Sequence, residues 1–175
     1  HRDLHSFPTR RSSDLYLAIF TTSFDDEGMI SIDEHIEFNF GTGVYSSPHD
    51  IALGDLNGDG LLDIVASEKG DVTDDFEAHT CIFINTSHHQ NFSFESPIII
   101  DGDGYEGSVQ LQDINGDGKL DIVTIRGSSM NVYINTSDGN NVSFEDKLII
   151  SNVSASEPDF ADLNGDGMID MVTTS

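Results

Sequence analysis

The sequence predicts an all-β protein assembled from repeated units. One acidic, glycine-rich segment occurs three times, and each copy runs into a short apolar stretch of β-favouring residues. Between the copies, pairs of β-rich stretches flank a polar turn, which is the pattern of a hairpin. No window of the chain shows the long 3.6-residue apolar period of an amphipathic helix. These three observations together favour antiparallel sheets over a helical architecture.

Composition limits the partners that such a protein could have. The 175 residues include 32 acidic and only 7 basic side chains, which gives a formal charge of −25. Binding to nucleic acid needs a basic surface, and binding to anionic lipids needs clustered Lys and Arg. The longest apolar run, residues 16–20, is far below the roughly 20 residues of a membrane helix. With 37% hydrophobic residues, the chain can still bury a core. We therefore expect no nucleic-acid partner and no membrane insertion within this segment.

Residues 1–15 differ in composition from the rest of the chain. This stretch contains three of the seven basic residues and has neither a strand period nor a helix period. It also lacks the apolar centre of a signal peptide. We expect a non-native or disordered N-terminal segment here, and we assign the repeats to residues 16–175.

The repeated segment has the composition of a calcium-binding loop. The copies DLNGDGLLD, DINGDGKLD and DLNGDGMID begin at residues 55, 113 and 162, and each reads D-x-N-G-D-G-x-x-D. Calcium takes six to eight oxygen ligands at about 2.3–2.6 Å. In a tight loop, positions 1, 3, 5 and 9 can present side-chain oxygens to a common centre, while position 7 contributes its backbone carbonyl. The predicted ligands of the three calcium sites are Asp55, Asn57, Asp59, Leu61 and Asp63; Asp113, Asn115, Asp117, Lys119 and Asp121; and Asp162, Asn164, Asp166, Met168 and Asp170.

A plain turn, a magnesium site and an EF-hand all fit the loop residues less well. Asn-Gly and Asp-Gly also form ordinary hairpin turns, but a plain turn leaves three neighbouring carboxylates without a compensating cation. Magnesium prefers rigid octahedral sites with retained waters. An EF-hand needs a bidentate Glu at position 12, where this chain has Ala66, Thr124 and Thr173. We therefore predict calcium in a loop that is not an EF-hand.

A second repeated motif lies between the loops. IFINTSHHQNFSFES (residues 82–96) matches VYINTSDGNNVSFED (residues 132–146), and a looser copy begins at Ala18. With these hairpins and the acidic loops, residues 16–175 resemble the FG-GAP/VCBS repeat family, which includes the propellers of integrin α-chains. The resemblance implies β-propeller blades of four antiparallel strands, with the calcium loop between the first and second strands of each blade.

The resemblance also implies the blade boundaries. Residues 16–40 would form half a blade, residues 49–100 and 108–150 complete blades, and residues 158–175 a second half blade. In the first complete blade we expect strands at residues 50–55, 62–67, 80–85 and 92–100. Propellers close with four to eight blades, so we expect a fragment of a larger propeller, and the resemblance implies that the complete propeller has seven blades.

The ligand-binding face is expected on the side opposite the calcium loops. Residues 68–79 form a long acidic connection between the second and third strands, and the connection between blades at residues 101–107 would emerge on the same side. Integrin-like propellers bind ligands on that face, which is what the resemblance implies. A solvated acidic loop without any ligand is the simpler interpretation. The candidate ligand-binding residues are Asp71, Asp74, Asp75, Glu77, His79, Asp101, Asp103 and Tyr105.

These features predict a binding module and not an enzyme. The sequence contains no nucleophile elbow, phosphate loop or HExxH motif, so we expect no catalytic residues. Calcium sites with affinities of about 10⁻⁴–10⁻³ M fill outside cells and empty inside them, which favours an extracellular, secreted or cell-surface location. We expect adhesion or binding to a protein or glycan ligand. The alternatives are a non-catalytic accessory region of a secreted polysaccharide-degrading enzyme and a structural spacer.

Overall fold

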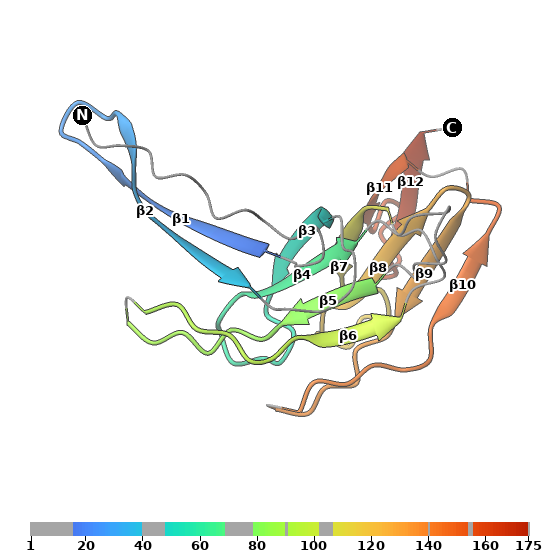
Figure 1. The fold of residues 1–175 in the computed structure, drawn as a ribbon. Helices are drawn as coiled ribbons and strands as arrows, with labels where there is room; N and C mark the ends of the chain where they lie inside the picture. Colours follow the sequence, from blue (N-terminus) through green and yellow to red (C-terminus); the bar gives the residue numbers. More distant parts are fainter. Residues whose placement is uncertain are drawn as a thin grey trace, which may run out of the picture. The chain divides into compact units, whose positions relative to one another are not determined.

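The computed structural model describes residues 16–39, 48–68, 79–89, 91–101, 107–139, 141–153 and 156–174. All regular structure in these ranges is β, as the sequence predicts (Figure 1). The chain divides into two compact units, His1–Ser46 and Ser47–Ser175. Within the described ranges, no helix is long and apolar enough to span a membrane.

The described residues of the first unit, 16–39, form an antiparallel hairpin. Strand β1 (Tyr16–Phe24) pairs with β2 (Ile30–Asn39). The Asp25 carboxylate closes the turn by accepting hydrogen bonds from the backbone amides of Glu27 and Met29, which is a common use of Asp in turns. This hairpin contains the looser copy of the second motif and lies within the predicted half blade.

The described residues of the second unit form two four-stranded antiparallel sheets and one two-stranded sheet (Figure 1). The first large sheet consists of β3 (Pro48–Gly54), β4 (Asp63–Glu68), β5 (His79–Phe83) and β6 (Ile98–Asp101). The second consists of β7 (Val109–Gln112), β8 (Asp121–Arg126), β9 (Ser129–Tyr133) and β10 (Leu148–Ser151). The two-stranded sheet pairs β11 (Ser156–Ala161) with β12 (Asp170–Thr174).

In both large sheets the spatial order of the strands follows the chain order. Each sheet is therefore an antiparallel meander of four strands, which is the architecture of a propeller blade. This arrangement confirms the predicted all-β fold class. In the described part of the second unit the sheets form an open series, and no closed propeller is present.

The predicted fourth strand at residues 92–100 is wrong in its extent. Only Ile98–Asp101 pair with β5, while the residues before them form the far arm of a hairpin held by separate bridges, such as Asn85 to Phe94. The cause lies at Asn85, because its backbone amide donates to the buried Asp63 carboxylate instead of to a neighbouring strand. The hairpin therefore leaves the ladder of the sheet at this residue, and the second sheet repeats the departure.

The two large sheets pack against each other through an apolar core. The buried members of this core are Leu56, Val65, Ile82, Ile84, Val109, Ile122 and Tyr133. The close approach depends on Gly54 at the end of β3. A Cβ atom there would lie 2.6 Å from Leu120 Cδ1 and 2.7 Å from Leu111 Cδ1. On the far side of the second sheet, Val123, Ile125, Met130 and Val132 pack against Phe160 of β11.

Candidate metal centre

Each acidic loop joins the first two strands of its sheet. The first loop occupies residues 55–63 between β3 and β4, the second precedes β8, and the third precedes β12. Strand pairing ends beside each loop, at the register pairs Gly54–Asp63, Gln112–Asp121 and Ala161–Asp170. The three loops therefore lie where the resemblance implies.

Position 1 of each loop organises the turn. The Asp55 carboxylate accepts hydrogen bonds from the backbone amides of Gly58, Asp59 and Gly60 at 2.7, 3.1 and 2.8 Å. The second and third loops repeat these three bonds. Gly58 and Gly60 have φ angles of 77° and 87°, in the left-handed region that glycine adopts without strain. The glycines of the motif are thus required by the conformation of the loop.

Positions 3 and 5 are bonded to each other. The Asn57 side-chain oxygen accepts the Asp59 backbone amide, and the Asn57 side-chain nitrogen donates to Asp59 Oδ2, both at 3.0 Å. The other Asp59 oxygen accepts the Leu61 amide at 2.8 Å. The same bonds recur in the second loop, where the hydrogen bond from the Lys119 amide is the main cause that lowers the pKa of Asp117.

Position 9 holds a buried carboxylate in the first two loops, with 0% exposure in both. In the first loop, Asp63 Oδ2 accepts the Leu56 amide and Oδ1 accepts the Asn85 amide, both at 2.8 Å. Burial raises the pKa of Asp63, the charges of Asp59 and Asp55 add to the rise, and the two amides oppose it. The carboxylate at position 9, the closing carboxylate, thus connects the loop to the end of the third strand. Its burial has an electrostatic cost that a bound cation would offset.

In the third loop, the carboxylate at position 9 accepts one backbone amide, where Asp63 of the first loop accepts two. The Leu163 amide donates to Asp170 Oδ2 at 3.0 Å. Among the described residues, no backbone amide is bonded to the other Asp170 oxygen, because β12 pairs there with β11 alone. Asp170 is also only partly buried.

The loop and the strands that follow it are a recognisable sequence unit. The family model described as FG-GAP-like repeat matches residues 113–173. Residues 113–173 are an FG-GAP-like repeat. This range begins at the first residue of the second loop, continues through β8, β9 and β10, and includes the third loop. The resemblance inferred from the sequence is confirmed over this range. No match to the chain was found among curated proteins.

The donor atoms of the three acidic loops fit a hard divalent cation. Each loop offers three carboxylates, one side-chain amide oxygen and the carbonyl of position 7, and calcium prefers such oxygen ligands. A carboxylate has about four lone-pair sites, so the amide hydrogen bonds leave acceptor capacity. Within the described ranges, however, no three Asp, Glu, His or Cys side chains form a preassembled metal-binding group. Each loop thus holds the predicted ligands on one turn, without a ready-made coordination shell.

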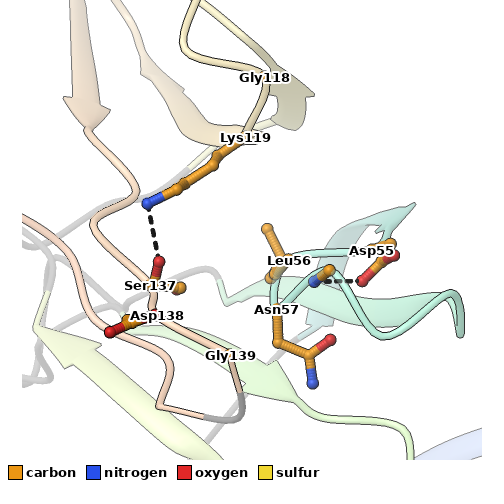
Figure 2. Close-up of a pocket in the computed structure, with 9 residues that line it drawn as sticks. Asp55, Leu56, Asn57, Gly118, Lys119, Ser137, Asp138 and Gly139 are labelled. Atoms are coloured by element: carbon orange, nitrogen blue, oxygen red, sulfur yellow. Dashed lines mark hydrogen bonds between the residues drawn. The ribbon is translucent and has the colours of Figure 1, made fainter.

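A groove of about 250 Å³ lies between the first two loops. Figure 2 shows how the residues that line it are arranged. Its lining residues are Asp55, Leu56, Asn57 and Gly58 of the first loop, Gly118 and Lys119 of the second, and Ser137, Asp138 and Gly139 of a hairpin turn. Lys119 Nζ donates to the Ser137 carbonyl at 2.7 Å. The position-7 side chain of the second loop is therefore engaged by the FG-GAP-like hairpin, which leaves its backbone carbonyl as the atom available to a cation.

Asn135 belongs to this site, although its role was not predicted from the sequence. It is 1% exposed. Its backbone amide donates to Asp121 Oδ1 at 2.8 Å, and its side-chain nitrogen donates to the carbonyls of Leu120 and Leu56, both at 2.9 Å. The side-chain oxygen accepts the Ser137 amide at 2.8 Å. The N-T-S sequence shared by both hairpins is the signal that could have identified this residue.

Most of the predicted ligand-binding residues lie outside the described ranges. These are Asp71, Asp74, Asp75, Glu77, Asp103 and Tyr105, and the N-terminal segment 1–15 also lies outside them. His79 begins β5 and pairs in register with Asp101, the last residue of β6. This pair lies at the end of the sheet away from the first acidic loop, so the connections after β4 and β6 meet the sheet at the same edge. Ligand binding at this edge stays a prediction.

Proposed function

We propose that the chain is a calcium-binding β-propeller module that works outside cells and binds a protein or glycan ligand. The observation that carries this proposal is the acidic loop, which has the same oxygen donors and the same position-1 hydrogen bonds in three places. A simple turn would need the glycines but would not need a buried carboxylate at position 9.

Calcium in these loops has a structural role. The residues that would hold it are the predicted ligands at positions 1, 3, 5, 7 and 9 of each loop, and the ion would supply positive charge between their carboxylates. In the first loop, Asp63 stands to gain most, because burial and two neighbouring carboxylates already raise its pKa. A cation favours the ionised form of such a group, and the hydrogen bonds of ionised Asp63 join the loop to the third strand.

An extracellular location follows from the expected affinity. Calcium sites of extracellular modules bind at about 10⁻⁴–10⁻³ M, so they are filled outside cells and largely empty in the cytosol. Exposed loops made of residues from one turn, as in this chain, suit that affinity range better than the enclosed sites of tight calcium buffers.

The ligand is assigned to the sheet edge at which His79 pairs with Asp101. Two connections meet the first sheet at this edge, and binding residues tend to lie on loops carried by a rigid scaffold. The module itself is non-catalytic. An accessory region of a secreted polysaccharide-degrading enzyme and a structural spacer are the other functions that such a module could serve.

Thermal unfolding of the whole chain tests the calcium proposal. We expect a higher Tm in about 1 mM calcium than in excess EDTA, because each site with the affinity above contributes about 0.4–1.4 kcal/mol at that concentration. Magnesium at the same concentration should have a smaller effect. The triple variant Asp59→Ala, Asp117→Ala and Asp166→Ala should lose the calcium response. An equal Tm in calcium and EDTA for the unaltered chain would show that the loops are empty turns.

A loop exchange tests the ligand assignment. The acidic connection after β4 can be replaced by the short Gly127–Ser128 turn that joins β8 to β9. On a glycan array and in a screen of extracellular proteins, the exchange should abolish binding but preserve the calcium-dependent rise in Tm. Binding that survives the exchange would place the ligand elsewhere, and the absence of any bound ligand would favour the spacer.

A further inference from the structure

Asn135 connects the closing carboxylates of two neighbouring acidic loops. Asp63 closes the first loop and accepts the Leu56 amide at 2.8 Å. The carbonyl of the same Leu56 accepts the Asn135 side-chain nitrogen at 2.9 Å, and the Asn135 backbone amide donates to Asp121 of the second loop at 2.8 Å. A continuous series of three hydrogen bonds thus runs from Asp63 to Asp121 through the interface between the sheets.

The members of this series are buried. Leu56 is 2% exposed, Asn135 is 1% exposed, and both closing carboxylates are 0% exposed. Hydrogen bonds in so poorly solvated an environment are stronger than in water and polarise one another. If the Asn135 side chain were removed, the Leu56 carbonyl would lose its partner in a place that water does not readily reach, and such a loss is costly.

Asn85 occupies the same position in the first sheet without the connection. Its backbone amide donates to Asp63, its side-chain nitrogen donates to the Leu62 carbonyl, and its side-chain oxygen accepts the Ser87 amide. These bonds all lie within the first sheet and its hairpin, and Asn85 is partly exposed. Asn85 and Asn135 therefore make the same local hydrogen bonds, and Asn135 makes in addition a bond to the neighbouring loop, at the Leu56 carbonyl.

We propose that Asn135 couples the first and second calcium loops, so that each loop binds calcium more tightly when the other is occupied. This inference rests on the proposed calcium function. When the first loop is ordered, the Leu56 carbonyl is fixed. A fixed carbonyl holds the Asn135 side chain, whose backbone then holds Asp121 in place for the second loop. Calcium binding at the first loop thus orders part of the second loop in advance, so the second loop loses less conformational entropy when it binds calcium. The result is positive coupling, which acts equally in the opposite direction.

A double-mutant cycle measures the coupling. In the full chain, Asp166→Ala removes calcium binding at the third loop, and Asp59→Ala then removes it at the first loop. The calcium affinity of the second loop is measured by isothermal titration with and without Asp59→Ala. We expect Asp59→Ala to weaken the second loop about fivefold or more, at the lower end of usual coupling. With Asn135→Ala added, this effect should fall below about twofold, whereas with Asn85→Ala it should persist.

A second variant and a calcium-free measurement guard against misfolding. Asn135→Ser can still accept the Ser137 amide, but a hydroxyl has one hydrogen to donate and cannot serve two carbonyls. Since at most one of the Leu56 and Leu120 carbonyls keeps a partner, this variant should weaken the coupling while keeping the hairpin turn. In EDTA, Asn135→Ala should lower the Tm more than Asn85→Ala, because it alone removes a bond between the sheets.

The outcomes separate the two proposals. If the unaltered chain takes up no calcium, the proposed function fails and the coupling fails with it. If calcium binds but Asp59→Ala affects the second loop equally in the Asn135→Ala and unaltered backgrounds, the proposed function stands and the coupling is overturned.

Discussion

Because Gly54 has no Cβ atom, the two large sheets can approach each other closely at the end of β3. The end of β3 lies against Leu111 and Leu120 of the next sheet, where a Cβ atom would come within 2.7 Å of both. Its counterpart in the second sheet is Gln112, since each of these residues pairs with the closing carboxylate of its own loop. The two repeats therefore share the motif residues of their loops but differ in the residue at the end of the first strand, Gly54 in one and Gln112 in the other.

Gly54→Ala should lower the free energy of unfolding by about 1–3 kcal/mol, the usual cost of overpacking a tight interior. The added methyl group must displace the ends of two leucine side chains. Urea unfolding in saturating calcium measures the change, and Gln112→Ala, which shortens a side chain at the matching place, is the control. A stability equal to that of the unaltered chain would mean that the leucines move aside freely.

The role of Asn135 illustrates what the sequence could not predict at the residue scale. The bond between Asn135 and Leu56 joins residues 79 positions apart, and no local pattern specifies such a partner. The bonds of Asn135 to Leu120 and Ser137 are local to one blade and recur around Asn85. Repetition of N-T-S therefore could have revealed the local function, while the connection between loops needed the packed structure.

Among the elements, the acidic loops were the most predictable. Their oxygen donors and glycines follow a fixed spacing, and the turn conformation is determined by bonds within nine residues. The first three strands of the first blade were also predicted to within about two residues. The fourth was not, because the Asn85 amide bonds to Asp63, which lies 22 residues away. Residues 91–95 still pair in antiparallel fashion with residues 84–88, but as the arm of a hairpin outside the ladder of the sheet.

Asp121 and Asp117, two of the three acidic residues of the second loop, should respond differently to replacement by Asn. In Asp121→Asn the new side chain has one acceptor for two backbone amides, those of Ile114 and Asn135. A buried amide left without a partner costs about 1–3 kcal/mol, so this variant should unfold more easily even in EDTA. Asp117→Asn, on the exposed side of the loop, should reduce the calcium response with little change in EDTA.

Unfolding curves in calcium and in EDTA for both variants provide the measurement. The structural role assigned to position 9 would be contradicted if Asp121→Asn and Asp117→Asn had the same stability in EDTA.

At the scale of the whole molecule, equivalent apolar residues of different sheets differ in exposure. Val109 on β7 is 3% exposed against the first sheet, whereas Ile51 and Leu53 on β3 are 51% and 60% exposed. On β12, Val172 is 52% exposed, while Val123 at the same place in β8 is fully buried. Within the second unit, the blade faces between neighbouring sheets are thus buried, and the equivalent residues of β3 and β12 are not covered by another sheet of that unit.

The formal charge of −25 predicts a salt dependence that calcium should reduce. Three divalent ions would change this charge to −19, and they would do so where the carboxylates are closest. Sodium chloride screens exposed charges, with a Debye length of about 10 Å at 0.1 M and about 3 Å at 1 M. We therefore expect the Tm in EDTA to rise with sodium chloride more steeply than the Tm in calcium. Parallel slopes would show that repulsion within the loops contributes little to instability.

The burial of Asn135 has a consequence for glycosylation. Asn135, Thr136 and Ser137 form an N-linked acceptor sequence, and the nitrogen that would carry the sugar is the one bonded to Leu56 and Leu120. Folding and oligosaccharide transfer would therefore compete for a single atom in a eukaryotic secretory pathway. Asn141 belongs to a similar acceptor sequence on the same hairpin but is exposed. A glycan there leaves the blade intact, whereas one on Asn135 would keep two blades apart.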